Sequence, residues 1–342
     1  MVRKEISLHA LANTLSEVKE SENFSLKIEA FNIFITTMLV FVMVVGLTGN
    51  TVVIYVFGVN RKKKRFERFL LSLGILDFLS SLIIPSTFLY LTVTGYKRWD
   101  FSKIGCKIIP TLLQISVSVT QGFLIMISYE RYHSIVNPFK KKISQLKLIL
   151  LFCIVLLVSF TLAIPYMMTF NILIDLEHGV NTCAPDGSKM NLSMIASSLR
   201  LLKDFVAISF MEFFRQRIKH SFLKVHTNSS WNKERETQKG RKILYTVIIV
   251  FSALTLPLDI FHFIYYMLSK FASSILNAKA YSVLMVVNTI LNLFQMANSV
   301  VNVFIYSRLH KNFNMKQHDS TASCSILYWN EDKNIISLNY HS

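Results

Sequence analysis

Charged residues inside apolar segments are the ones that could do chemistry in this chain. Glu130, Arg131 and Tyr132 follow one another at the end of an apolar helical run that begins near Lys107. Asp77 stands alone in the middle of another apolar run. Charges at membrane depth are costly and usually functional. Glu130 and Arg131 therefore either have a functional role or serve as an interfacial anchor. Asp77 either holds an ion, a proton or a polar partner, or has a packing role only.

Enzymatic chemistry is not predicted. The chain has no paired metal-ligand motif, no nucleophile elbow and no phosphate-binding loop. Its nine histidines are scattered, mostly in segments that read as loops or tails. We therefore expect neither a bound metal nor an organic cofactor.

The composition predicts a membrane protein. Hydrophobic residues make up 52% of the chain, and they gather into long blocks separated by basic segments. Blocks of about 20 apolar residues match the hydrocarbon thickness of a bilayer, so each block is typical of a spanning helix. The net charge of +17 lies between these blocks, as the positive-inside rule expects, so we predict no nucleic-acid partner.

The predicted fold is all-α: a seven-helix membrane bundle with its N-terminus outside. A basic block at 61–65 directly after the first span sets this orientation. We expect an extracellular tail at 1–30, the bundle at 31–308, an amphipathic surface helix at 309–316 and a cytoplasmic tail at 317–342. The protein is expected to be a multi-pass protein of the cell membrane. The spans are predicted near 31–58, 66–94, 107–131, 146–170, 194–214, 243–268 and 281–306.

The fifth span is the weakest of the seven. Arg200, Lys203, Asp204 and Glu212 interrupt its apolar pattern. Such charges must face the bundle, pair with one another or extend toward the membrane surface. The sequence leaves these three alternatives open.

The predicted topology sorts the cysteines and the modification sites. Cys106 and Cys183 both fall outside the cell, where a disulfide can form, and we expect them to be bonded. Asn23 and Asn191 begin glycosylation triplets on the same side. Cys324 lies in the inner tail and is either palmitoylated or unmodified.

With these features in place, the chain resembles a rhodopsin-like (class A) G-protein-coupled receptor over about residues 30 to 316. Each motif alone is weak to moderate, but their order and register together are specific. The motifs are Gly49-Asn50-Thr51-Val52; Leu73 and Asp77; Trp99, Phe101, Cys106 and Lys107; Glu130-Arg131-Tyr132; and Asn302-Val303-Phe304-Ile305-Tyr306.

The chain also departs from the family pattern. Val303 stands where the last motif usually has a proline. In the sixth span Pro257 and the packing residue Phe251 match the family, but Thr255 replaces the usual tryptophan. The fourth-span tryptophan and fifth-span proline are missing. These departures predict a divergent receptor with altered activation geometry.

The resemblance implies a switch at the inner end and a polar core. Arg131 would pair with Glu130 in the silent state and meet a G-protein when the sixth helix swings outward. The resemblance places Tyr132, Asn302 and Tyr306 in the same switch. The core would hold either a sodium ion or a hydrated network without an ion. Its residues would be Asn50, Asp77, Thr120, Asn298 and Asn302.

The resemblance also implies an outward-facing ligand pocket. Leu113 stands where amine receptors carry an aspartate, so a monoamine ligand is not predicted. Met296 stands where opsins carry a lysine, so retinal is not predicted. Three acids in the loop above the pocket, Asp175, Glu177 and Asp186, favour a peptide ligand and are compatible with a basic one. The expected pocket residues are Leu113, Gln114, Val117, Asp259, His262, Asn292 and Gln295.

Two alternatives to a signalling receptor remain open. A transporter or channel could line its path with Asp77 and the amides of the seventh span. Against this, the chain shows neither paired halves nor a glycine-broken helix pair. The other alternative is a receptor-like protein that binds ligand without activating a G-protein.

For the signalling receptor, the expected partners are an extracellular ligand, a heterotrimeric G-protein and membrane lipid.

Overall fold

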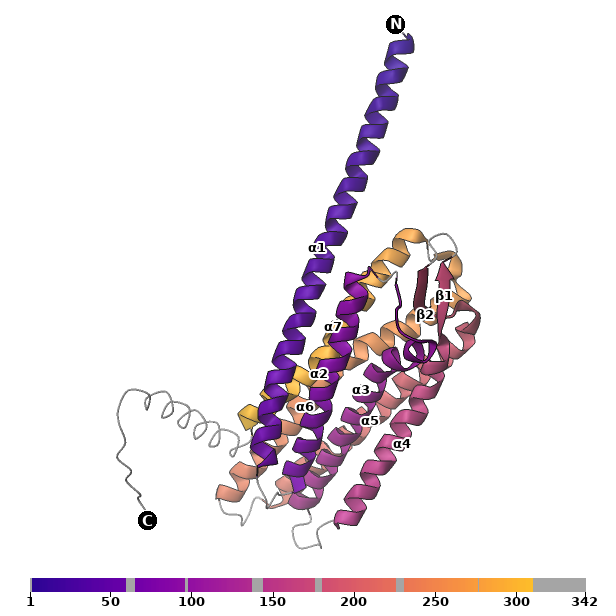
Figure 1. Ribbon diagram of the computed structural model, residues 1–342. Helices are drawn as coiled ribbons and strands as arrows, with labels where there is room; N and C mark the ends of the chain where they lie inside the picture. The colour runs from indigo at the N-terminus through magenta and orange to yellow at the C-terminus, as the bar shows by residue number, and fades with distance from the viewer. Residues whose placement is uncertain are drawn as a thin grey trace, which may run out of the picture.

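A computed structural model describes residues 2–59, 65–95, 98–136, 144–175, 180–225, 231–275 and 277–309 of the chain. Within these ranges long helices pack side by side into a bundle (Figure 1). The helices are α1 (Val2–Gly58), α2 (Arg65–Val93), α3 (Lys103–Val136), α4 (Gln145–Thr169), α5 (Met190–Val225), α6 (Trp231–Phe271) and α7 (Ala278–Leu309).

Six of these helices, all except α5, are long and apolar enough to cross a membrane. Helix α5 is long enough, but its charged residues interrupt the apolar pattern. The most apolar helix, α4, buries only 11% of its best window inside the protein. Its exposed side chains include Leu146, Leu157 and Phe160. An apolar outer surface of this kind is what lipid contact requires.

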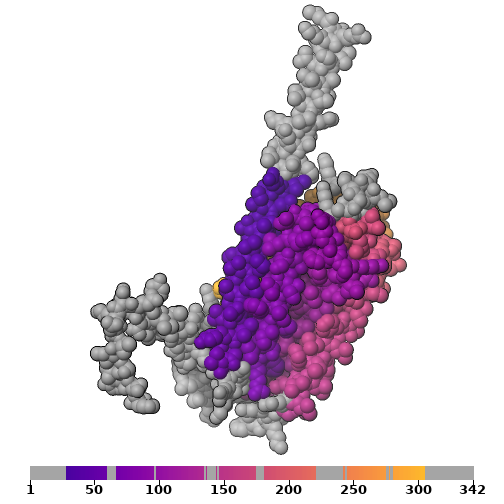
Figure 2. Space-filling model, in the orientation of Figure 1, coloured from indigo at the N-terminus to yellow at the C-terminus, as the bar shows by residue number. Residues whose placement is uncertain are grey.

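Glycines allow some helices to approach closely. A Cβ atom on Gly49 of α1 would lie 3.0 Å from a methyl carbon of Val303 in α7. A Cβ atom on Gly46 would collide with Ser81 of α2, and one on Gly122 of α3 would collide with Val155 of α4. Small residues at such contacts are a usual feature of helix packing in membranes. Figure 2 shows α1 and α2 side by side along one face of the bundle.

Helix α1 is longer than its predicted span. Its backbone is helical from Val2, and its apolar part begins at Ile28 (Figure 1). The sequence predicts an extracellular tail at 1–30, and the helical backbone of this segment is not expected from it. The first span itself agrees with the predicted range.

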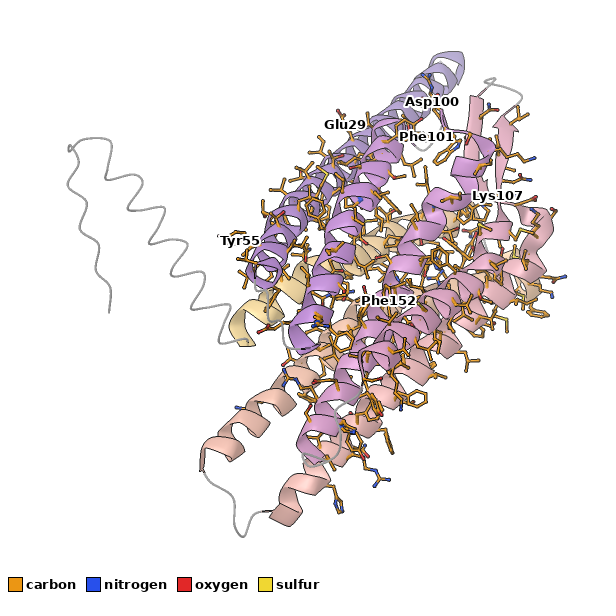
Figure 3. All side chains as sticks on the ribbon, turned by 60° about the horizontal axis from the view of Figure 1, so that its bottom comes forward. Glu29, Tyr55, Asp100, Phe101, Lys107 and Phe152 are labelled. Carbon is orange, nitrogen blue, oxygen red and sulfur yellow. A yellow bond between two sulfur atoms is a disulfide. The ribbon has the colours of Figure 1, made fainter. Side chains whose placement is uncertain are left out.

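The outer end of the bundle carries an antiparallel hairpin of β1 (Phe170–Asp175) and β2 (Val180–Pro185), with Cys183 opposite Ile172. Cys183 is bonded to Cys106 at the start of α3, which confirms the predicted disulfide. The hairpin was not predicted. Asp100 and Phe101 lie at this same end (Figure 3).

Several predicted features fall outside the described residues. They are the surface helix at 309–316 beyond its first residue, the tail at 317–342 with Cys324, and loop residue Glu177. The side chains of Asn23, Asp175 and Tyr306 are outside them as well. Expectations for these positions remain predictions.

Candidate functional site

The polar core is built around Asp77, which is 1% exposed on α2. Its Oδ2 accepts a hydrogen bond of 3.0 Å from Nδ2 of Asn302 on α7. Its other oxygen, Oδ1, is buried and has no hydrogen-bond partner among the described residues. A buried oxygen without a partner is a place where water or a cation can bind.

Two further core residues connect neighbouring helices. Asn50 of α1 donates to the carbonyl of Gly46 at 2.9 Å and to that of Ser299, on α7, at 3.2 Å. Ser80 of α2 and Ser116 of α3 share a hydrogen bond of 2.5 Å. The structure therefore joins α1, α2, α3 and α7 through polar side chains.

A small cavity of about 10 Å³ lies beside this core, which is room for about one water molecule. Its polar walls are hydroxyl and amide side chains, and its apolar walls include two predicted pocket residues, Leu113 and Val117. Thr120 is buried on α3 and is not part of the cavity wall. The polar lining consists of Ser80, Ser81, Ser116, Gln295, Asn298 and Ser299.

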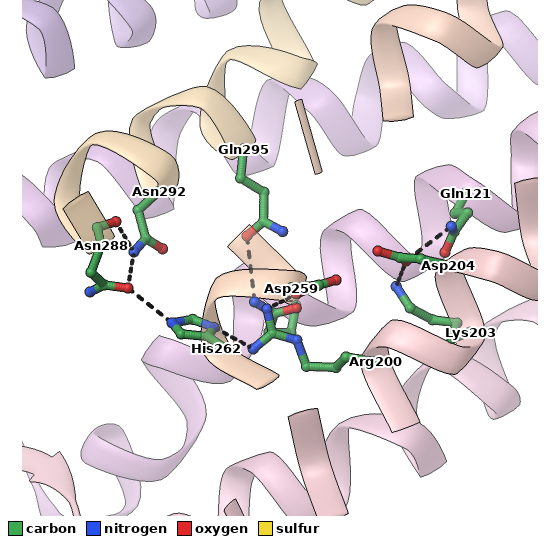
Figure 4. A network of polar contacts seen from close by, with 10 residues as sticks. Gln121, Arg200, Lys203, Asp204, Asp259, His262, Asn288, Asn292 and Gln295 are labelled. Carbon is green, nitrogen blue, oxygen red and sulfur yellow. Dashed lines mark hydrogen bonds and ion pairs between the residues drawn. The ribbon is translucent and has the colours of Figure 1, made fainter. Parts of the chain in front are cut away.

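A second buried polar cluster, here called the charged network, is drawn in Figure 4. It lies toward the hairpin end of the bundle, because Arg200 contacts Tyr166, four residues before β1. At its centre Arg200 of α5 forms an ion pair with Asp259 of α6, and their side chains are 5% and 0% exposed. The guanidinium also lies over the ring of Tyr166 on α4, 5.2 Å from the ring centre, in a cation–π contact.

The charged network continues from α6 to α7 through neutral groups. Nδ1 of His262 lies 3.1 Å from Arg200, and Nε2 lies 2.9 Å from Oδ1 of Asn288. Since the amide oxygen can only accept, Nε2 donates and Nδ1 accepts from the guanidinium, which is the pattern of a neutral imidazole. Asn292 donates to the carbonyl of Asn288 at 2.8 Å.

Two more contacts connect the charged network to α3. Gln121 donates to Oδ1 of Asp204 at 3.1 Å, and Lys203 lies 2.9 Å from the same oxygen. Gln114 donates to Gln295 of α7 at 3.4 Å. Of the three alternatives for the fifth-span charges, Arg200, Lys203 and Asp204 therefore face the bundle and are paired. Glu212 pairs with Arg215 one turn further along the same helix.

The inner end of α3 carries the predicted switch residues. Glu130 accepts a hydrogen bond of 3.2 Å from Ser134. Arg131 is half-buried. The ring of Tyr132 packs on Phe214 of α5 with 5.6 Å between the ring centres. A Glu130–Arg131 pair stays a prediction.

Comparison with known proteins decides the family. The profile of the family described as "7 transmembrane receptor (rhodopsin family)" matches residues 49–306. The chain belongs to this family. Such receptors are not enzymes, and the protein is a multi-pass protein of the cell membrane.

Curated relatives are similar along most of the receptor. It is 26% identical over 296 residues to neuropeptide Y receptor type 6 of Mus musculus, covering 80% of this chain and 76% of that protein. It is 26% identical over 300 residues to neuropeptide Y receptor type 4 of Rattus norvegicus, covering 82% and 76%. It is 25% identical over 287 residues to type-1 angiotensin II receptor B of Xenopus laevis, covering 82% and 77%.

The residues that are predicted to take part in activation lie inside α6. Phe251 is buried, and the hydroxyl of Thr255 donates to the carbonyl of Phe251 at 2.9 Å. The hydroxyl of Thr255 thus has its hydrogen-bond partner within its own helix. At this position the family usually has the bulky indole of a tryptophan. Pro257 lies inside α6, which remains helical through it.

The outer surface has its own ion pair. Nε of Arg98 donates to Asp100 at 2.6 Å, and the hydroxyl of Tyr90 donates to the same carboxylate at 2.9 Å. These two donors hold the pKa of the Asp100 carboxyl below its usual value. Between β2 and α5, hydrogen bonds from Ser188 likewise lower the pKa of the Asp186 carboxyl.

The predicted glycosylation site Asn191 lies in the first turn of α5. Its side chain is exposed and accepts a hydrogen bond of 2.6 Å from Lys270 at the end of α6. The third residue of the triplet, Ser193, is buried. Glycosylation of Asn191 stays a prediction.

The sequence predicts one pocket around Asp259, His262, Asn292 and Gln295 but does not predict Arg200 and Asn288, which bond to the first three. Gln295 bonds to Gln114, itself an expected pocket residue. The available signal was charge balance: Arg200 and Lys203 have one acid, Asp204, beside them in the fifth span, so a further acid had to come from another helix, and Asp259 is the candidate in the sixth span.

Proposed function

We propose that the receptor binds an extracellular peptide in the outer half of its bundle and activates a heterotrimeric G-protein at its inner end. The observation that carries this proposal is the charged network, in which buried polar side chains of α3, α5, α6 and α7 meet. Pockets that recognise ligands combine apolar walls with a few convergent polar groups. The inner Glu130-Arg131-Tyr132 motif supplies the coupling end.

Support for a peptide ligand comes from the relatives, which are named for neuropeptide Y and angiotensin II. The charge of that peptide is a separate matter. Because Asp259 is already paired with Arg200, it is not a free counter-ion for a basic ligand. A basic peptide would depend on the loop acids instead, of which Asp186 is hydrogen-bonded to Ser188.

The test uses Arg131→Ala and measures dissociation of G-protein subunits in cells, first without ligand and then with fractionated peptide extracts. We expect the variant to lose the signal, because the guanidinium is the group that would meet the G-protein. Arg98→Ala is the matched control, since Arg98 is paired at the outer surface. Unchanged signalling by Arg131→Ala at equal surface expression would contradict the coupling role.

A receptor-like protein that binds ligand without signalling is the second candidate. Thr255 favours it, because its hydroxyl is bonded within α6 and no indole occupies its position. Ligand binding without G-protein dissociation, across a panel of G-protein subtypes, would identify this candidate. A transporter is not supported, since the chain belongs to a receptor family.

A further inference from the structure

The ion pair between Arg200 and Asp259 joins two helices, unlike its neighbours. The pairs Arg98–Asp100, Lys203–Asp204 and Glu212–Arg215 each link residues within three positions of one another. Arg200 and Asp259 are 59 positions apart, on α5 and α6. Both side chains are almost completely buried, so separating them would leave a charge without compensation in a region of low dielectric.

The location of Asp259 makes this pair important for movement of α6. Asp259 lies two residues beyond Pro257, where the helix lacks one backbone donor and bends most easily. A change of direction at Pro257 therefore has to move Asp259 relative to α5. His262, one turn further, is attached to α7 through Asn288, so the same segment is held from two sides.

The residue one turn before Asp259 is the small Thr255, where the family usually has a tryptophan. Thr255 is completely buried and bonded to its own helix, so it offers no large ring for neighbouring helices to hold. The guanidinium of Arg200 lies among Asp259, His262 and the face of Tyr166, and so joins α5 to α6 and α4. A buried contact between helices is the kind of element that a ligand can bias.

We propose that the Arg200–Asp259 ion pair is an internal restraint that holds α5 and α6 in the silent arrangement and opens when the receptor is activated. This inference rests on the proposed signalling function. It adds that part of the ligand's binding free energy is used to separate Arg200 from Asp259. It also predicts that a ligand competes with one of these two charges.

The first experiment measures basal G-protein dissociation in cells at matched surface expression. Asp259→Asn keeps the shape of the side chain and removes its charge. The double variant Arg200→Met with Asp259→Leu fills the site with apolar groups, which often replace a buried ion pair without loss of stability. We expect both to raise basal dissociation about three- to tenfold, because the silent state loses its restraint.

Two matched variants separate the restraint from a general effect of charge. Asp100→Asn makes the same carboxylate-to-amide change in an ion pair whose residues are two positions apart, so basal dissociation should stay at the level of the unmodified receptor. The double variant Arg200→Asp with Asp259→Arg exchanges the two charges and rebuilds the ion pair with its acid on α5 and its base on α6. It should return basal dissociation toward the level of the unmodified receptor. If the exchanged receptor does not reach the surface, the Asn variant and the apolar pair decide the question.

The second experiment does not depend on a G-protein. Spin labels on Lys219→Cys in α5 and Lys242→Cys in α6, both exposed, report the distance between the two helices in purified receptor. Cys153 and Cys324 are replaced by serine so that only the introduced thiols are labelled. We expect Asp259→Asn and the apolar pair to populate a longer distance than the reference.

The outcomes separate the two proposals. The restraint would be overturned if Asp259→Asn and the apolar pair both keep the helix distance and the basal dissociation of the unmodified receptor. Longer distances in those variants, with no G-protein dissociation in any receptor including the reference, would support the restraint and overturn the signalling function. A rise in Asp100→Asn equal to that of Asp259→Asn would also overturn the restraint.

Discussion

Asp77 and Asp259 are both buried carboxylates inside the bundle, yet the protein stabilises them in different ways. Asp259 lies in a network that contains its own cations, since Arg200 pairs with it directly and Lys203 is paired with the neighbouring Asp204. Asp77 has neutral donors instead, of which Asn302 bonds it at 3.0 Å, and it has no charged partner among the described residues. The outer cluster therefore balances its own charges, whereas the charge of Asp77 has no counterpart in the described part of the bundle.

This difference has a physical consequence for how each cluster tolerates change. A paired charge is most sensitive to losing its partner, because the remaining charge stays buried. A buried carboxylate without a charged partner is most sensitive to the composition of the solution, because water, a proton or a cation must satisfy its oxygens. Three predictions test the contrast, from the largest expected effect to the smallest.

The largest effect is expected for Arg200→Met alone. It leaves Asp259 buried without its cation, which should cost about 3–5 kcal/mol of stability. Thermal unfolding of the purified receptor measures this loss. Combining Arg200→Met with Asp259→Leu should recover most of it. A double variant as unstable as the single one would mean that packing of the guanidinium, and not its charge, stabilises the site.

The second effect concerns sodium and Asp77. If the core binds sodium, the ion should stabilise the reference receptor by about 1 kcal/mol at a concentration several times its Kd. Asp77→Asn should abolish this dependence, because the amide cannot balance the ion. Melting temperatures in sodium chloride and in choline chloride at equal ionic strength measure both. A reference receptor that melts equally in the two salts would favour a hydrated core without an ion.

The smallest effect is expected for Asp100→Asn at the outer surface. Because Arg98 and Tyr90 lower the pKa of Asp100, their contribution to stability is present above the unfolded-state pKa of about 4. This contribution to stability is lost as the pH falls through the lower pKa that Asp100 has in the folded protein. The difference in melting temperature between reference and variant should therefore be small at neutral pH and vanish in acid. A difference that grows in acid would contradict this assignment.

Much of the bundle could be predicted because helix length and apolar pattern follow directly from bilayer thickness. The disulfide followed from topology, since Cys106 and Cys183 share one face. Motif register placed Asp77 and Asn302 in one group, and the structure brings them into contact. In each of these cases the information is local or is carried by position along a span.

The pairing of Arg200 with Asp259 could not be predicted in the same way. It depends on the rotation of α5 and α6 about their own axes, which an interrupted apolar pattern does not determine. The hairpin was missed because its strands are short and lie in a loop whose conformation is set by the disulfide and its neighbours. The helical backbone of residues 2–27 was missed because that segment is polar and has no span-like pattern.

The hairpin is held on both sides at the outer end. On one side Cys183 is covalently attached to α3, and on the other the backbone amide of Trp99, after α2, donates to the carbonyl of Asn181 at 2.7 Å. Strand β2 is thus attached at two points to the short segment that leads from α2 into α3. A ligand that arrives from outside therefore meets a hairpin whose position is set by a covalent bond and not by the ligand itself.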